Sequence, residues 1–170
     1  MKRLIAGFMA ILTLACCLTG CSRKLSDQVA PPEMTVVLGD ERVKALRGTT
    51  EWAHLVTKKE WYEVREEADL PMMRKGEVPC LEFTVSEEKN VVTLEFDIPP
   101  IDFYVNQYAI DAWGDIMAEY YEPEVDRTNF SFEISDEEAI YEVWARWYTN
   151  EGTKQQGHAY YSFYTKKVSE

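Results

Sequence analysis

The sequence predicts an all-β fold in which two antiparallel sheets pack face to face. The clearest signal is the alternation of large apolar with polar side chains from Leu81 to Ser86 and again from Val92 to Ile98. Such a period of two gives a strand one apolar face. The remaining chain shows short segments separated by turn residues, with no long amphipathic helix, internal repeat or heptad pattern. This arrangement favours a sandwich over a barrel or an α/β fold.

The other elements follow from turn residues and local alternation. Gly39-Asp40 separates two apolar runs and predicts a hairpin, while 58–67 fits either a strand or a helical turn. Segment 70–79 is expected to be a loop, 112–125 a loop or short helix, and 87–90 a polar turn. The expected strands are 34–38, 42–47, 49–56, 81–86, 92–98, 103–110, 130–134, 139–148 and 159–167. Segment 103–110 is apolar or aromatic on both faces, as in a central strand or one whose outer face binds a ligand.

Tyr141 indicates the kind of sandwich. The stretch from Glu137 to Val143 has the spacing of a tyrosine corner, in which a Tyr two residues before an inward position bonds back to the preceding backbone. Val143 stands where antibody domains have a cysteine. The pattern therefore predicts an immunoglobulin- or fibronectin-like antiparallel β-sandwich without the inter-sheet disulfide. The alternative is a strand that simply opens with an aromatic residue.

The N-terminal residues have the layout of a secretory signal. Lys2-Arg3 precede an apolar stretch from Leu4 to Leu18, and Thr19-Gly20 precede Cys21. Leu-Thr-Gly-Cys resembles the lipobox of bacterial lipoproteins, whose cysteine receives diacylglycerol and becomes the mature N-terminus. One alternative is an ordinary secreted protein cut near position 20. Another is a membrane-spanning helix, which needs ~20 apolar residues and so a longer stretch.

Three regions are expected on this basis: a cleaved signal helix at 1–20, a flexible lipidated tether at 21–33 and a β-sandwich domain at 34–170. Segment 22–33 is polar and contains Pro31-Pro32. A short edge strand at 28–30 is the alternative, which the prolines disfavour because they cannot donate to a ladder. Two acyl chains on Cys21 would hold the protein stably on the extracytoplasmic side of a cell membrane, whereas a single chain would bind only reversibly.

Charge and cysteine content narrow the function classes. The chain has a formal net charge of −12. Removing residues 1–20, which hold two basic residues and no acidic ones, would leave −14, so nucleic acid is not an expected partner. Cys16 and Cys17 leave with the signal and Cys21 is lipidated, which leaves Cys80 without a disulfide partner. We expect Cys80 to be a buried small hydrophobe, with a reactive or intermolecular thiol as the alternative.

No motif in the sequence predicts a cofactor, a metal or a catalytic centre. His54 and His158 lie far apart and outside any cluster with zinc-ligand spacing, and no phosphate loop, nucleophile elbow or dinucleotide fingerprint occurs. The 30 carboxylates lack the order of a calcium loop. Solvated turns are their simpler interpretation, although a carboxylate pair for glycoside hydrolysis stays open.

Aromatic side chains provide the better candidate site. In the strand that begins at the tyrosine corner, alternate residues turn outward, and the same parity applies to the last strand. If 103–110 joins these two strands in one sheet, its outer face gathers aromatic rings around one arginine. Such residues commonly anchor sugars, peptides and protein partners. The candidate binding face is Tyr104, Tyr108, Trp144, Arg146, Tyr148, Tyr160 and Tyr164. The alternatives are that a neighbouring segment such as 112–125 covers this face, or that the rings only steady the sheet.

Several segments carry a family likeness. The stretches 31–36, 41–49 with Trp52, 141–143 and 159–164 resemble the outer β domain of some clostridial membrane metallopeptidases of the β-lactam-sensor type, and of related small lipoproteins. The resemblance implies an extracytoplasmic sandwich that acts in sensing or interaction. It implies no protease activity, because the chain contains no His-Glu-x-x-His.

Together these observations predict a lipid-anchored, extracytoplasmic binding or sensing module of a bacterial envelope that is not an enzyme. Its expected partners are the membrane, through Cys21, and an envelope protein, peptide or glycan. The alternatives are an envelope hydrolase that uses paired carboxylates and an accessory subunit that packs on a membrane protein.

Overall fold

The computed structural model describes residues 31–57, 60–84, 90–148 and 155–168, and within them it is nearly all β. Four predictions lie wholly or largely outside these residues: the signal peptide, the lipidation of Cys21, the tether up to residue 30 and the turn near 87–90. The strands are β1 (Met34–Leu38), β2 (Glu41–Lys44), β3 (Leu46–Thr57), β4 (Glu60–Glu66), β5 (Cys80–Phe83), β6 (Val91–Phe96), β7 (Asp102–Ala109), β8 (Val125–Asp126), β9 (Ser131–Glu133), β10 (Ala139–Trp147) and β11 (Gln155–Lys167). Two 3₁₀ turns, η1 (Pro71–Met73) and η2 (Ile110–Ala112), complete the elements.

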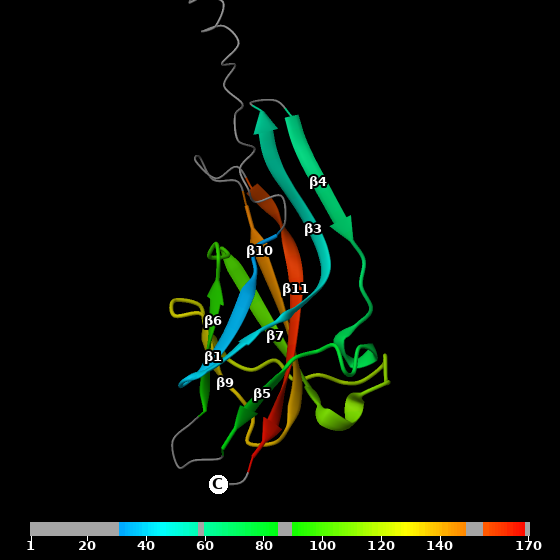
Figure 1. Cartoon of the computed structure of the whole chain (residues 1–170), viewed down its shortest axis with the longest axis vertical. Coiled ribbons are helices and arrows are strands. Elements are labelled where there is room, and N and C mark those ends of the chain that lie inside the picture. Colours follow the sequence, from blue (N-terminus) through cyan, green and yellow to red (C-terminus); the bar gives the residue numbers. More distant parts are fainter. Residues whose placement is uncertain (1–30, 58–59, 85–89, 149–154, 169–170) are drawn as a thin grey trace, which may run out of the picture.

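Two sheets form the sandwich, and their strand order is that of an immunoglobulin domain. The smaller sheet runs β2-β1-β6-β9-β8 and the larger one β4-β3-β11-β10-β7, with β5 parallel to the end of β11. Taking β1, β6, β8 and β9 as strands A, B, D and E, and β7, β10 and β11 as C, F and G, gives the expected A-B-E-D and C-F-G neighbours. In Figure 1 the smaller sheet lies to the left of the larger one. The β3–β4 hairpin of the larger sheet extends beyond the smaller sheet at the top of the picture.

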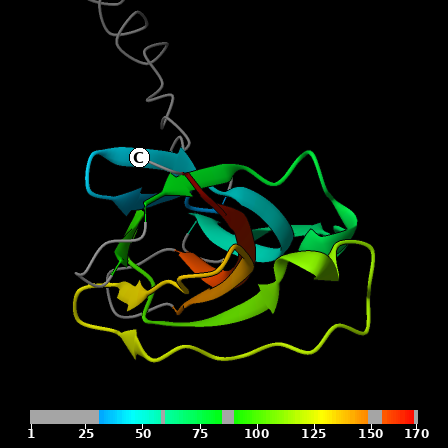
Figure 2. The same ribbon diagram turned by 90° about the horizontal axis from the view of Figure 1, so that it is seen from below.

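Segment 41–79 is an insertion into this plan. It first pairs β2 with β1 in the smaller sheet, then adds the β3–β4 hairpin to the edge of β11 and passes through η1 before β5 begins at Cys80. Figure 2 shows that η1 and η2 lie on the side of the larger sheet opposite the smaller sheet. The outer face of the larger sheet therefore gains walls that a plain sandwich lacks.

The core between the sheets is aromatic. Its largest buried side chains include Trp52, Phe103, Tyr141, Trp147, Tyr161 and Phe163. Trp147 touches Trp52 edge-on at 5.5 Å between ring centroids, and Gly157 lies between them in the register. A Cβ added at Gly157 would lie 2.1 Å from the Glu51 carbonyl oxygen, and the φ angle of Gly157 is 143°. Only glycine lets β3 and β11 approach closely enough for the two indoles to meet.

The tyrosine corner is confirmed. The Ser135 N–H donates to the Tyr141 hydroxyl at 2.9 Å, and the ring is fully buried against Phe132 and Phe163. Burial raises the pKa of Tyr141 to about 12, so the phenol stays neutral at physiological pH. The inward parity predicted for β10 is confirmed as well, because Ala139, Val143 and Ala145 are buried.

Several element predictions need correction. Segments 81–86 and 92–98 belong to different sheets, because β5 pairs with β11 and β6 pairs with β1 and β9. Segment 58–67 contains strand β4, which settles its ambiguity. Strand β7 lies at the edge of its sheet rather than in the centre. Phe103 and Val105 on its inner face enter the core, and its outer face is buried at Tyr108, within a second apolar cluster, but exposed at Tyr104.

The end of the expected tether is docked on the domain. The Tyr161 hydroxyl donates to the Pro32 carbonyl, and Pro31 and Pro32 are buried. Glu33 exchanges hydrogen bonds with Asp97 and forms an ion pair with Lys44. Residues 31–33, which the sequence predicts to be part of the tether, therefore pack against the sandwich.

Candidate functional site

The outer face of β7, β10 and β11 is a set of cross-strand rows. Strand register places Tyr104 opposite Trp144 and Trp144 opposite Tyr160, and the next row contains Asp102, Arg146 and His158. Directly opposed side chains lie close enough to interact. The sequence prediction that 103–110 joins the last two long strands in one sheet is confirmed by these pairings.

Five of the predicted face residues form one surface. Trp144 stacks on Tyr104 at 4.9 Å, and the Arg146 guanidinium carbon lies 5.3 Å from the Trp144 ring centre and 4.8 Å from that of Tyr148. The His158 ring lies 6.0 Å from Trp144 and 6.2 Å from Tyr160. We call this set the aromatic face: Tyr104, Trp144, Arg146, Tyr148, His158 and Tyr160. Tyr148 is 50% exposed and Tyr104 36%, so the surface is accessible at both ends.

Two predicted residues do not belong to the exposed surface. Tyr108 is 6% exposed and packs with Met72, Ala112 and Ile140. Tyr164 is half-buried against Trp113, at 5.7 Å between centroids. The covering segments are η1 and the stretch after η2, so the expected alternative that residues near 112–125 cover the face holds for its lower part.

Arg146 is fixed by its neighbours. It donates to Asp102 at 3.2 Å and to the Tyr148 hydroxyl at 3.0 Å, while its buried Nε has no acceptor. The guanidinium lies near two aromatic ring centres and retains its positive charge there. The aromatic face thus carries one oriented cation among its rings.

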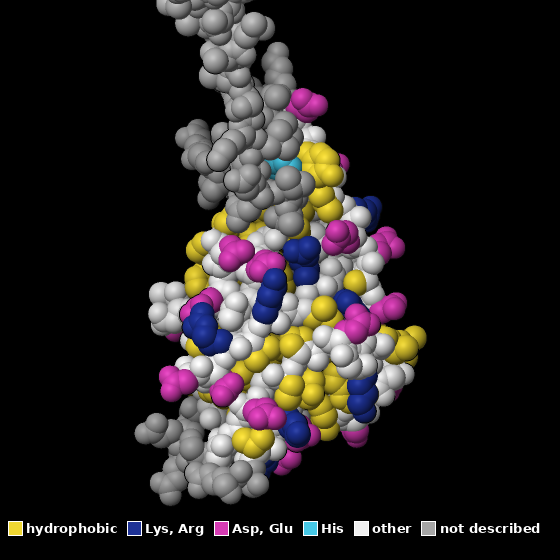
Figure 3. Space-filling view, in the orientation of Figure 1, with side chains coloured by type: hydrophobic (Ala, Val, Ile, Leu, Met, Phe, Trp, Pro, Cys, Tyr) yellow, Lys and Arg dark blue, Asp and Glu magenta, His cyan; other side chains and the backbone are white. Residues whose placement is uncertain are grey.

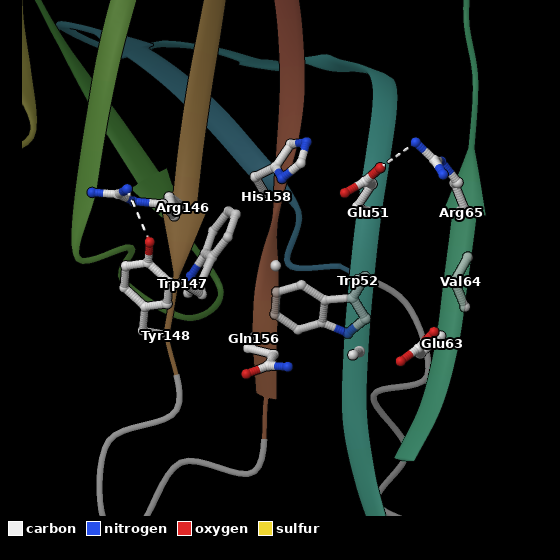
Figure 4. Close-up of a pocket in the computed structure, with 12 residues that line it drawn as sticks. Glu51, Trp52, Glu63, Val64, Arg65, Arg146, Trp147, Tyr148, Gln156 and His158 are labelled. Carbon is white, nitrogen blue, oxygen red and sulfur yellow. Dashed lines mark hydrogen bonds and ion pairs between the residues drawn. The ribbon is translucent and has the colours of Figure 1, made fainter.

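An upper pocket of about 470 Å³ continues from Arg146 toward the inserted hairpin. Figure 4 shows Arg146 on β10 with Tyr148 directly after the strand, Gln156 and His158 on β11, and the Glu51–Arg65 ion pair joining β3 to β4. Trp52 and Trp147 also line this pocket. It is built by the standard sheet on one side and the insertion on the other.

A lower pocket of about 340 Å³ lies below the aromatic face and shares Tyr104 and Tyr160 with it. Its other wall is the 68–74 segment, which includes Asp69 and Arg74. Glu142 and Asn106 also line it, although Glu142 is 7% and Asn106 9% exposed. A buried carboxyl in a pocket is an uncommon feature that points to function.

The electrostatics of the lower pocket follow from burial. Desolvation raises the pKa of Glu142, and hydrogen bonds donated by Asn106 and Tyr108 partly offset this by favouring the carboxylate. Burial also raises the pKa of Tyr104, which its hydrogen bond with Tyr160 and the nearby Glu142 charge raise further. Within the described residues, Glu142 forms no ion pair.

Glu142, Asn106 and His158 were not identified as candidates from the sequence. Glu142 follows from β10 parity as an outward residue, and its burial comes from η1 and the 68–74 segment, which no local pattern predicts. The glycine before His158 suggests a turn, whereas β11 already begins at Gln155. Strand parity applied from residue 155 would have placed His158 beside Tyr160 on the same face.

The face of the molecule drawn in Figure 3 has acidic and basic side chains interspersed, with hydrophobic ones between them. The residues with assigned positions include no group of three or more His, Cys, Asp or Glu arranged to hold a metal. Among them there is also no helix long and apolar enough to cross a membrane. Cys80 is free and half-buried.

Comparison with protein families, curated proteins and solved structures finds no match to this chain. The resemblance to the outer domain of clostridial metallopeptidases stays a prediction from the sequence segments that carry it. The functional argument therefore depends on the geometry of the aromatic face and its two pockets.

Proposed function

We propose that this chain is a lipid-anchored, extracytoplasmic binding or sensing module of a bacterial envelope, and that the aromatic face is its binding surface. The lipidation signal ending at Cys21 supports the location. The observation that best supports binding is the position of Trp144. Its ring lies between Tyr104, His158 and the Arg146 guanidinium on an open sheet face.

The composition of the face fits recognition of a peptide, glycan or envelope protein. Rings of this kind offer large contact area at low conformational cost, and arginine adds directional hydrogen bonds. The rings are already packed against one another, so binding would order few side chains. The Arg146 guanidinium, oriented by Asp102 and Tyr148, places a positive charge among the rings for an acceptor on the partner.

A pull-down of the lipidated protein from envelope extracts tests the proposal. The double variant Trp144→Ala, Tyr160→Ala is expected to lose the partner that the unmodified protein recovers, because both rings contribute to one row. Tyr121→Ala is the matched control, since Tyr121 is 64% exposed and belongs to neither the aromatic face nor the two pockets beside it. Equal recovery of every partner by the double variant and the control would refute the binding surface. A membrane protein as the lost partner would identify the chain as an accessory subunit.

A hydrolase is the second candidate, and Glu142 is the observation that favours it. A buried carboxyl with a raised pKa can act as a general acid, and Asp69 lines the same pocket. Purified cell-wall glycan would then be cleaved by the unmodified protein and by neither Glu142→Gln nor Asp69→Asn.

A further inference from the structure

The floor of the lower pocket contains a polar network that leaves one acceptor unsatisfied. Glu142 and Asn106 both line this pocket, and Asn106 and Tyr108 interact with the Glu142 carboxyl in a way that favours its charged form. The Asn106 Oδ1 atom is buried and has no hydrogen-bond partner.

An unpaired acceptor beside a buried carboxylate is costly in the free protein. A buried polar group without a partner destabilises the folded protein, and a carboxylate held away from water does so more strongly unless a cation neutralises it. Arg74, which lines the pocket, donates its guanidinium to Glu77 at 2.8 Å and to the Arg47 carbonyl at 3.4 Å. The pocket therefore has no counter-charge of its own directed at Glu142 among the described contacts.

From this floor we infer that the lower pocket binds a primary ammonium group. Glu142 and Asn106 Oδ1 supply acceptors for its N–H donors, and Asp69 adds negative charge at the rim. The Tyr104 and Tyr160 rings line the same pocket and stabilise a cation through their π faces. Glu142 meets the ligand directly, and a small adjustment of the Asn106 side chain brings Oδ1 into contact.

The size of the pocket limits the ligand. About 340 Å³ accommodates an aminoalkyl chain or one amine-bearing residue, with the rest of a larger ligand extending over Tyr104. A lysyl side chain and a free diamine share this chemistry. The inference goes beyond the proposed function and holds whether or not the aromatic face has a macromolecular partner.

NMR titration of the full chain in detergent tests the inference, with the ¹⁵N-labelled side-chain amide of Asn106 as the reporter. The probes are Nα-acetyl-lysine amide and 1,5-diaminopentane, and Nα,Nε-diacetyl-lysine amide is the uncharged control. Both ammonium probes are expected to shift the Asn106 signals and the acetylated control is not. Binding by one ammonium probe and not the other tells a lysyl side chain from a free diamine.

The variant Glu142→Gln keeps the shape of the side chain and is expected to weaken probe binding at least about ten-fold, since the charge is lost. Asp40→Asn removes a charge at the exposed β1–β2 turn and serves as its matched control. Asp69→Lys, at an exposed rim position, should weaken binding as well and decides the test if Glu142→Gln does not fold. Equal binding of the acetylated control, or no shift with any probe, would overturn the inference. Tyr121→Ala, which lies outside the aromatic face and both of its pockets, should leave probe binding intact.

Discussion

At the scale of single residues, burial decides what each polar group does. Glu142 and Glu137 lie close in sequence, yet Glu142 is covered by the 68–74 segment and Glu137 stays exposed. Tyr141 is buried with a satisfied hydroxyl, whereas Trp52 Nε1, both His54 nitrogens and Asn106 Oδ1 are buried without partners. Unsatisfied atoms of this kind are uncommon in folded proteins. Asn106 and Trp52 line the two pockets beside the aromatic face.

Glu142 should make stability depend on pH. Its folded-state pKa is raised, so the stability that the neutral acid contributes is fully present below the unfolded-state pKa and is lost as pH rises through the folded-state value. Glu142→Gln stays neutral throughout. We therefore expect the variant to gain stability relative to the unmodified protein as pH rises above about 4.

Urea unfolding at several pH values measures this difference. The group faces Asn106 and Tyr108 on its own sheet and Asp69 and Arg74 on the wall opposite. Glu137→Gln is the control, because it shows how the loss of an exposed carboxylate alone changes the free energy of unfolding. A difference for Glu142→Gln that falls as pH rises would contradict the assignment.

At the scale of elements, the insertion 41–79 builds both pockets. It adds β3 and β4 to the edge of β11 and then lays η1 and its neighbours against the outer face. A standard sandwich would leave this edge and face open. The close contact of β3 with β11 at Gly157 is the point on which this arrangement depends.

Gly157→Ala should therefore destabilise the protein by about 2–4 kcal/mol, because the new Cβ would collide with the β3 backbone and the residue has a positive φ. Gly48→Ala is the matched control on β3, since its Cβ would lie at an ordinary 3.5 Å from Tyr160. Denaturant midpoints compare the two. Similar losses in both variants would show that the contact at Gly157 is not under constraint.

At the scale of the whole molecule, the proposed anchor and the folded domain have separate roles. The domain carries strong negative charge, which anionic headgroups repel, so attachment to the membrane would depend on the lipid. Pro31 and Pro32 are docked beneath Tyr161 at the end of the chain that leads to Cys21.

Cys21→Ala is expected to abolish labelling with radioactive palmitate and to move the protein from the membrane fraction to the soluble fraction. The pull-down of a partner through the aromatic face should persist in a soluble extract. Labelling that persists in the variant would disprove lipidation at Cys21.

Local patterns were sufficient for much of the fold. Period-two alternation identified the faces of β6 and β10, and the spacing around Tyr141 identified the corner before β10. The same parity placed Tyr104, Trp144, Arg146, Tyr148 and Tyr160 on one surface. Each of these signals depends on neighbours within one strand or turn, and local sequence encodes such relations directly.

By itself, the sequence determined a disulfide-free sandwich with a tyrosine corner and the outward residues of its last two long strands. Only the tertiary structure decided that β5 and β6 join different sheets, that Tyr108 and Tyr164 are covered, and that Glu142 and Asn106 lie at the floor of a pocket. These features arise where segment 41–79 and the stretch after η2 fold back on the larger sheet. Contacts between segments so distant in sequence leave no periodic pattern in either one, because burial there depends on which surface arrives from elsewhere.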